Sequence, residues 1–381
     1  MAKLGEVCIQ ITDGSHNPPS GVEQSEYLML SSKNIDDDFI TLDSPRFLSH
    51  SDYIAENKRT TVSEGDLLMT IVGTIGRVAI VPEELKGICL QRSVAVIKPE
   101  REVVNNRYLM YQLQNMRPFL EKEARGVAQK GIYLKQVSQL DIKLPELEHQ
   151  MQIVKVLDKA SKLIFLRRQQ LAKLDELVKA RFVEMFGDPV KNTMDWEIKP
   201  LSELGELNRG VSKARPRNSP ELLGGPYPLI QTGEVANAKT YITSFSSTYS
   251  EKGLAQSKMW PKGTLCITIA ANIAQTSILT FDACFPDSVV GFISRNMTNE
   301  LFIHYWFSFF QKILDEQAPQ VAQKNINLKI LSELNVIVPP LSLQNRFAAF
   351  VERVDQQKQT VQQSLEKLEL MKKALMQEYF G

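Results

Sequence analysis

Two long segments of the chain carry apolar residues at the spacing of a helical seam. In residues 148–187 and 342–381 these positions advance in steps of four and three, the heptad pattern of helices that pack along one stripe. The first seam is interrupted at Arg167 and the second at Lys358 and Lys372. The seam residues are Ile153, Leu157, Ala160, Ile164, Leu171, Leu174 and Val178, and Phe347, Val351, Val354, Val361, Leu365, Leu368 and Leu375. We predict that the two stripes pack on each other.

Each long segment follows a region of short apolar runs separated by glycine and proline. Such runs with turn signals between them are typical of short β-strands. The expected strands are Tyr27–Leu30, Leu67–Val72 and Val78–Val81 in the first region, and Leu265–Ile269 and Ser277–Thr280 in the second. One helix is expected after each set of strands, from Asn106 to about Met116 and from Glu300 to about Ile313. The patterns predict two mixed α/β modules, and they leave the strand order open.

The second half of the chain repeats the first. Residues 127–134 return as 321–328, and residues 184–187 return as 378–381, both at an offset of 194. Near the N-terminus the offset is 200, as for Leu4-Gly5-Glu6. The offset shrinks along the chain, so small deletions are expected in loops of the second copy. Two similar but non-identical modules predict two similar surfaces with different fine specificity, and therefore a bipartite target.

These patterns together predict the fold class and the domain organisation. The fold class is α/β, with two similar α/β modules separated by a pair of long antiparallel coiled-coil helices in a pseudo-twofold internal repeat. Each helix would be about 58 Å long if unbroken. The expected parts are the first module (1–147), the first long helix (148–187), a connector (188–198), the second module (199–341) and the second long helix (342–381).

Composition narrows the class of protein. The 381 residues are 43% hydrophobic, which predicts a soluble globular chain of two or three domains. No apolar run reaches the roughly 18 to 20 residues of a membrane span, and the N-terminus lacks a signal peptide, so a cytoplasmic protein is expected. The four cysteines show no Cys-x-x-Cys spacing, which argues against a zinc or redox site. A net charge of +1 argues mildly against a chain that grips nucleic acid alone.

Assembled in this order, the pieces resemble the specificity subunits of type I restriction-modification systems, over essentially the whole chain. Asp13-Gly14-Ser15-His16-Asn17-Pro18-Pro19 is similar to a recognition loop, Gly73-Thr74-Ile75-Gly76-Arg77 to an inter-strand turn, and Gly131-Ile132-Tyr133-Leu134 to the segment before the long helix. The helix ending Phe186-Gly187-Asp188-Pro189-Val190 and the Trp196 connector also fit. In the second module Asn208–Lys213 replaces the loop at Asp13–His16, so the two half-sites are expected to differ.

The resemblance implies a non-catalytic subunit that reads a bipartite, gapped site in double-stranded DNA. Each module would be a target recognition domain for one half-site, and the long helices would fix the spacer. At about 3.4 Å per base pair, about 58 Å of helix gives an upper guide of about 17 base pairs. The resemblance further implies two methyltransferase subunits, which methylate adenine N6, and it leaves open an endonuclease or translocase subunit. No cofactor is expected, and the apolar helix faces leave open a homodimer without partners.

Candidate DNA contacts follow from residue type. Arg suits guanine, Asn and Gln suit adenine, and Ser and Thr suit either. The match of Tyr27–Lys33 with Tyr227–Gly233 implicates the loops after both strands. The candidates are Ser15, His16, Asn17, Lys33, Asn34, Arg77, Gln91, Arg92 and Lys130 in the first module, and Lys213, Arg215, Arg217, Gln231, Thr232, Asn272, Gln275 and Lys324 in the second.

Two other classes of function compete with this interpretation. Asn17-Pro18-Pro19-Ser20 is close to the motif that holds the flipped base in amino-methyltransferases, but Ser20 replaces the aromatic residue and no glycine-rich cofactor loop precedes it. The histidines have no metal-ligand spacing, so a self-contained enzyme is disfavoured. A two-headed protein-interaction scaffold without DNA recognition remains the alternative. Arg167 and Lys358 would either reach solvent along the helix pair or contact phosphates or a partner subunit.

Overall fold

The computed structural model describes residues 1–124, 131–270, 273–309 and 326–381. The chain divides into two compact units. Unit 1 contains residues 1–168 and 363–381, and unit 2 contains residues 169–362. Each unit therefore holds one module together with one half of each long helix.

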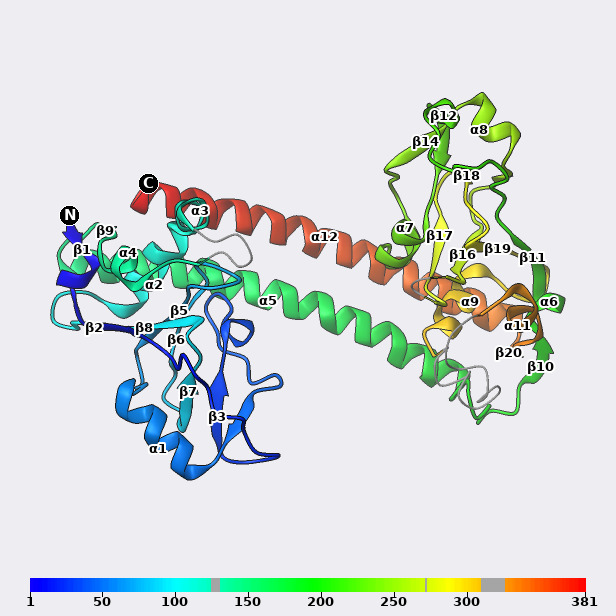
Figure 1. Cartoon of the computed structure of the whole chain (residues 1–381). Coiled ribbons are helices and arrows are strands. Elements are labelled where there is room, and N and C mark those ends of the chain that lie inside the picture. The colour runs from blue at the N-terminus through cyan, green and yellow to red at the C-terminus, as the bar shows by residue number, and fades with distance from the viewer. Residues whose placement is uncertain (125–130, 271–272, 310–325) are drawn as a thin grey trace. The chain divides into compact units, whose positions relative to one another are not determined.

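The long helices are α5 (Leu147–Phe186) and α12 (Leu341–Phe380), each of 40 residues (Figure 1). In unit 1, Leu157 of α5 shares a core with Phe380 near the end of α12. In unit 2, Phe186 at the end of α5 packs on Phe347 near the start of α12, with ring centroids 5.5 Å apart. The pairing is antiparallel within each unit, as the two heptad seams predict.

The interrupted seam positions of α12 form ion pairs inside the units. Lys358 Nζ lies 2.7 Å from Asp175 Oδ1, and the lysine side chain is only 13% exposed. Lys372 Nζ lies 3.4 Å from Asp38 Oδ2 and 5.2 Å from the ring centroid of Tyr111. The idea that the charge of Lys358 reaches solvent along the helix pair is therefore wrong, because Asp175 of the opposite helix neutralises it within the pair.

The first module is built of two main sheets and a short strand pair. The strand pair is β1 (Ala2–Lys3) with β9 (Asp141–Ile142). The strands of the larger sheet lie in the order β2 (Cys8–Asp13), β8 (Val94–Pro99), β5 (Leu67–Thr70) and β6 (Val78–Ile80). The strands of the smaller sheet lie in the order β4 (Arg46–Leu48), β3 (Tyr27–Leu30) and β7 (Ile88–Leu90). The described helices are η1 (Leu4–Glu6), η2 (Ser32–Asn34), α1 (His50–Arg59), α2 (Asn106–Asn115), α3 (Arg117–Glu123) and α4 (Leu134–Ser138).

The second module has the same plan. Its strand pair is β10 (Glu197–Pro200) with β20 (Asn335–Val338). The strands of its larger sheet lie in the order β11 (Gly205–Arg209), β19 (Val289–Ser294), β16 (Leu265–Thr268), β17 (Thr276–Leu279) and β13 (Tyr241–Ile242). The strands of its smaller sheet lie in the order β14 (Ser247–Tyr249), β12 (Leu223–Leu229), β18 (Ala283–Cys284) and β15 (Met259–Trp260). Its described helices are α6 (Leu201–Leu204), η3 (Pro220–Leu222), α7 (Thr232–Asn237), α8 (Glu251–Ala255), α9 (Glu300–Phe307) and α11 (Leu328–Glu333).

The internal repeat is visible in the strand order. The antiparallel run β2-β8-β5-β6 of unit 1 has its counterpart in β11-β19-β16-β17 of unit 2. The second sheet of each module also contains an equivalent parallel strand pair. It is β3 with β7 in the first module and β12 with β18 in the second. The prediction of a duplicated mixed α/β fold is confirmed.

A buried glutamine joins each module to its long helix in the same way. Gln150 Oε1 accepts from the main-chain N of Asn105 at 2.8 Å, and its Nε2 donates to the carbonyls of Val103 and Pro145. Gln344 repeats these bonds at an offset of 194, with Asn299 N at 3.2 Å. Because Asn105 and Asn299 cap α2 and α9, the glutamines tie the start of the module helix to the start of the long helix.

Aromatic side chains fill the core of unit 2. Phe182, Phe186, Phe302 and Phe347 are each fully buried, and neighbouring rings in this group lie 4.9 to 5.5 Å apart between centroids. Tilted and edge-to-face pairs at these distances add to the stability gained from burial alone. The C-terminal half of α5 is thereby packed against both α9 and α12.

Most of the strand and helix expectations are confirmed to within one or two residues. No helix was predicted at α1, whose residues are all at least partly exposed, so it has no buried apolar stripe. The helix expected from Glu300 ends at Phe307, and the part expected beyond residue 309 lies outside the described residues. The predicted domain borders remain predictions. Among the described residues no helix is long and apolar enough to cross a membrane.

Candidate nucleic-acid interface

Three loops of the first module meet at the ends of their strands. Ser15 follows β2, and its main-chain N donates to the carbonyl of Leu90 at 2.7 Å. Arg92 N returns a bond to the carbonyl of Ser15 at 2.9 Å, and Gln91 N donates to Leu30 O at 2.9 Å. These bonds hold residues 13–17, 30–34 and 90–93 together, and we call this set loop cluster 1.

The second module builds the corresponding set, and its first loop makes two equivalent backbone bonds. Gly210 N donates to Val289 O at 2.8 Å, as Gly14 N donates to Val94 O at 3.2 Å. Val211 N donates to Phe285 O, in the position of the bond from Ser15 to Leu90. We call residues 210–219, 230–233 and 285–288 loop cluster 2. The shared bonds give both modules one scaffold for presenting different side chains.

A glycine is required where the first loop of each cluster crosses the neighbouring strand end. A Cβ on Gly14 would lie 2.0 Å from the carbonyl oxygen of Leu90. A Cβ on Gly210 would lie 2.2 Å from the carbonyl oxygen of Phe285. Both distances are far inside van der Waals contact, so only glycine allows the loops to approach this closely.

Carboxylates hold several polar side chains of loop cluster 1. Asp13 accepts from Arg59 at 2.9 Å and lies 2.8 Å from His16 Nε2, while Ser15 Oγ donates to Glu56 at 3.0 Å. The side chains of His16, Asn17, Lys33 and Arg92 are exposed, and Gln91 is partly exposed. The cluster therefore presents a mixture of cationic and amide groups to solvent.

Like Ser15, which is 6% exposed, Asn34 is a candidate that the structure places in the interior. It is only 1% exposed, its Nδ2 donates to the carbonyl of Asp43 at 3.0 Å, and its Oδ1 accepts from Ser31 N. These bonds close the turn around η2. Asn34 thus holds the shape of loop cluster 1, and its amide is already occupied by the backbone.

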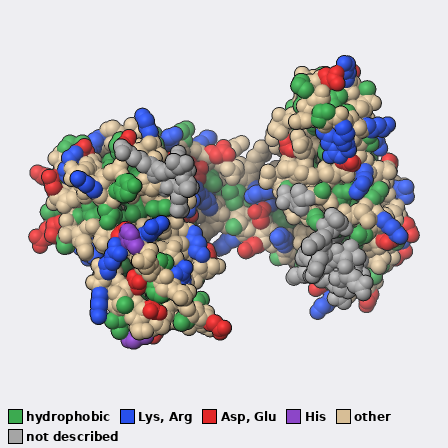
Figure 2. Space-filling model, in the orientation of Figure 1, with side chains coloured by type: hydrophobic (Ala, Val, Ile, Leu, Met, Phe, Trp, Pro, Cys, Tyr) green, Lys and Arg blue, Asp and Glu red, His purple; other side chains and the backbone are tan. Residues whose placement is uncertain are grey.

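The candidates of loop cluster 2 surround a cleft of about 180 Å³. Arg217, Gln231 and Thr232 line it together with Ser212 and Ser288. Arg215 and Lys213 are exposed beside it, and one guanidinium nitrogen of Arg215 donates to the carbonyls of Ser212 and Ala214 at 2.8 Å each. Figure 2 shows Lys and Arg side chains gathered on the part of unit 2 where β18 lies in Figure 1.

Arg77 and Gln275 occupy equivalent places in a second repeated feature, the turn between β5 and β6 or between β16 and β17. Thr70 N donates to Arg77 O at 2.9 Å, and Thr268 N donates to Gln275 O at 3.0 Å. Arg77 is further held by Asp36 at 3.7 Å, whereas the Gln275 side chain is exposed. The remaining candidates Lys130, Asn272 and Lys324 lie outside the described residues.

Residue-type reasoning missed the acidic members of the clusters. The rule for base contacts selects donors and so passes over Asp13, Asp287 and the neighbouring Glu56 of α1. Each of these carboxylates contacts a predicted contact residue, namely His16, Arg217 and Ser15 respectively. A signal was present for Asp287. Ser93 matches Ser288 at an offset of 195, and the same offset aligns Arg92 with Asp287. The charge at this position is therefore reversed between the two copies.

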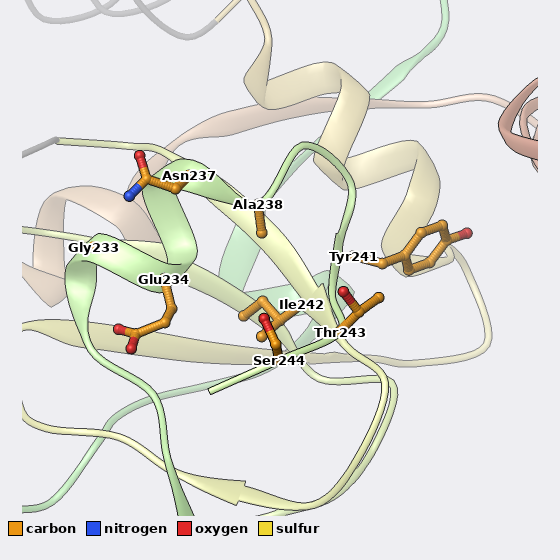
Figure 3. A pocket seen from close by; sticks show the side chains of 8 residues that line it. All are labelled: Gly233, Glu234, Asn237, Ala238, Tyr241, Ile242, Thr243 and Ser244. Atoms are coloured by element: carbon orange, nitrogen blue, oxygen red, sulfur yellow. The ribbon is translucent and has the colours of Figure 1, made fainter. Parts of the chain in front are cut away.

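The cleft shown in Figure 3 is polar but carries no catalytic arrangement among its lining residues. It has a volume of about 460 Å³ and lies along α7 and β13. Burial acts to raise the pKa of Glu234, but hydrogen bonds from Ser246 and from main-chain N–H groups lower it overall. One of those groups is Gln231 N, so this carboxylate caps α7. Burial raises the pKa of Tyr241 to about 12, so its hydroxyl is no base at neutral pH.

The remaining groups suited to chemistry are also occupied or buried. Among the described residues no group of His, Cys, Asp and Glu is arranged to hold a metal ion. All four cysteines are free, and burial raises the pKa of Cys8 and of Cys89 to about 12. These thiols stay protonated at neutral pH and are poor nucleophiles.

His304 of unit 2 makes a testable contribution to the pH dependence of stability. Burial, assisted by the charge of Lys358, lowers the pKa of His304 from 6.5 to about 4, and its Nδ1 pairs with Thr276 Oγ1 at 2.9 Å. The folded chain keeps this imidazole neutral while the unfolded chain protonates it below pH 6.5. Stability is therefore lost as pH falls from about 6.5 to about 4, by about 2 kcal/mol.

This pH effect can be measured by denaturation at pH 7 and pH 4.5 with tryptophan fluorescence. All three tryptophans lie in unit 2, so the signal reports that unit. The variant His304→Gln keeps a hydrogen-bonding group but cannot titrate, and we expect its loss between the two pH values to be smaller by about 2 kcal/mol. Equal losses in both proteins would contradict the assignment.

The sequence of this chain is similar to a known family profile and to known proteins. The sequence profile described as the type I restriction modification DNA specificity domain matches residues 29–176 and 193–370. A protein of Methanocaldococcus jannaschii with the provisional name of type I restriction enzyme MjaX specificity subunit is 23% identical over 348 residues, 85% of this chain and 80% of its own length. The type I restriction enzyme EcoBI specificity subunit of Escherichia coli is 36% identical over 100 residues, 26% of this chain and 21% of its own length.

A solved structure has the same fold. The type I restriction-modification system S subunit from M. genitalium aligns with 100% of this chain and 95% of its own, with a TM-score of 0.58 at 14% identity. At that identity the likeness concerns the fold.

Proposed function

Because the chain belongs to the type I restriction modification DNA specificity family, we propose that it reads a bipartite, gapped site in double-stranded DNA with one module per half-site. Specificity subunits of this family perform no catalysis, and this chain is a specificity subunit of that kind. The proposed target recognition domains are residues 1–147 and 199–341. The long helices α5 and α12 would determine the spacer between the half-sites.

One observation carries the bipartite interpretation: the first loops of the two clusters share two backbone bonds, whereas the side chains of the clusters differ. Gly14 and Gly210 make equivalent bonds, yet Ser15 is replaced by Val211, and Arg92 by Asp287. A shared scaffold keeps each surface suited to the same kind of ligand, while changed donors and acceptors change the bases that fit. The proposed contacts are the exposed members His16, Asn17, Lys33, Arg92, Lys213, Arg215, Arg217 and Gln231.

We assign the transfer of methyl groups to partner subunits. Two methyltransferase subunits that modify adenine N6 would dock on the long helices, and the proposal leaves open whether an endonuclease or translocase subunit joins them. Large apolar side chains on the unit 1 half of the helices support this, since Phe165 is 56% and Leu370 is 69% exposed. Leu166 beside Phe165 and Met371 beside Leu370 are also exposed, and apolar residues that gather on one surface mark protein contacts. Without partners, the same faces could also join two copies of this chain.

The function is tested by mapping N6-methyladenine in DNA from cells that express the chain with the methyltransferase subunit of its own system. We expect one gapped motif that is absent when the chain is omitted. Methylation that is unchanged by the chain would contradict the proposal and favour the protein-interaction scaffold. Methylation of a motif with a single ungapped half would retain DNA recognition but contradict the assignment of one half-site to each module.

A further inference from the structure

An arginine and an aspartate of loop cluster 2 form a pair that the fold does not need. Arg217 Nη2 donates to Asp287 Oδ1 at 2.7 Å and to Oδ2 at 2.9 Å. Both side chains are about 40% exposed, with values of 41% and 40%. An ion pair in contact with this much water contributes little to stability. Its two partners come from different loops, so the pair fixes the position of the guanidinium.

The pair lies at a cleft with a mixed polar and apolar lining, which also holds proposed base-contacting side chains. Arg217 lines the 180 Å³ cleft with Gln231 and Thr232, and Pro286 and Ser288 line it on either side of Asp287 in sequence. The guanidinium has five N–H donors, and only those on Nη2 are engaged by the carboxylate. The other donors remain available to a ligand in the cleft.

The charge of Asp287 argues against a role in holding phosphate. A carboxylate beside the DNA backbone is repelled by the phosphates, whereas a carboxylate facing base edges accepts the N4–H group of cytosine. Arginine donates to O6 and N7 of guanine. A donor fork and an acceptor that are held side by side therefore match the two edges that one G·C base pair presents in the major groove.

We infer that the Arg217–Asp287 pair reads one G·C base pair in the half-site of the second module, with Arg217 on guanine and Asp287 both positioning Arg217 and accepting from cytosine. The inference rests on the proposed function and adds the base pair and the residues that read it. In the first module Arg92 stands where Asp287 stands in the second. That half-site is therefore read differently at the corresponding position.

The test is a methylation map from cells that express the full complex with Arg217→Ala, Asp287→Asn or the control Lys252→Ala. Lys252 forms a comparable exposed ion pair with Glu221 at 3.2 Å in the same module, outside the cleft. We expect Arg217→Ala to reduce the preference for G·C at one position of one half-site by roughly ten- to a hundredfold. Asp287→Asn should relax the same position less, and Lys252→Ala should leave the motif unchanged.

The outcomes separate this inference from the function on which it rests. A wild-type complex that methylates a gapped motif, combined with an unchanged motif in Arg217→Ala, overturns only the inference. A uniform fall in methylation with every position retained also overturns it, because that is the effect of a lost phosphate contact. If Arg217→Ala abolishes methylation altogether, the motif of Asp287→Asn is the test, since this variant keeps the arginine. A relaxed position supports the inference, and an unchanged motif overturns it. A wild-type complex without a gapped motif overturns the proposed function itself.

Discussion

Replacing Gln344 by leucine is expected to lower the free energy of unfolding of unit 2 by about 3 to 5 kcal/mol. The side chain is fully buried, and its Oε1 accepts from Thr298 Oγ1 at 2.9 Å and from Asn299 N at 3.2 Å. Its Nε2 donates to the carbonyls of Met297 and Pro339. Leucine has a similar size but satisfies none of these groups, and each unpaired buried polar group costs about 1 to 3 kcal/mol.

The matched control for Gln344→Leu is Gln357→Leu, an exposed position on the same helix α12. It should change stability by no more than about 0.5 kcal/mol. Urea denaturation followed by tryptophan fluorescence reports unit 2 alone, because Trp196, Trp260 and Trp306 all lie there. A loss below about 1 kcal/mol in Gln344→Leu would show that the backbone groups around it find other partners.

The long helices could be predicted from sequence because their signal is periodic and local. The predicted segments 148–187 and 342–381 match α5 and α12 to within one residue at each end. The glutamines Gln150 and Gln344 match at the offset of 194, but a single glutamine before a helical seam has no local feature that marks it as buried. Its role depends on Asn105 and Asn299, which are 45 residues away in sequence in each case.

The site was predicted in outline only, for a related reason. Residue type selected candidates on loops that the fold brings together, such as those of Ser15 and Gln91, and their contact with DNA stays a prediction. It could not show that Asn34 faces inward or that Asp287 meets Arg217, because burial and ion pairing are decided by contacts between distant segments. Candidate contact residues chosen as hydrogen-bond donors therefore describe the site fully only when the carboxylates that orient them are also known.

Substituting alanine for Gly210 is expected to remove recognition of the second half-site while the first module stays intact. The new Cβ would meet the carbonyl oxygens of Phe285 and Pro286 at 2.2 and 2.4 Å. Backbone atoms cannot swing aside as a side-chain end can, so the loop must shift and lose its bonds from Gly210 N and Val211 N. Residues 211–217 would move with it, and Arg217 would leave its place at the cleft.

Methylation at the wild-type motif should fall by more than about a hundredfold in Gly210→Ala, because several base contacts are lost together and each mismatched pair costs about 1 to 3 kcal/mol. Lys252→Ala is the control, since Lys252 is an exposed residue of α8 in the same module and lies outside loop cluster 2. Far-UV circular dichroism checks that α5 and α12 remain folded. Gly14→Ala should act likewise through the first half-site. Wild-type methylation by a folded Gly210→Ala protein would show that the close crossing at Phe285 does not shape the DNA-reading loop.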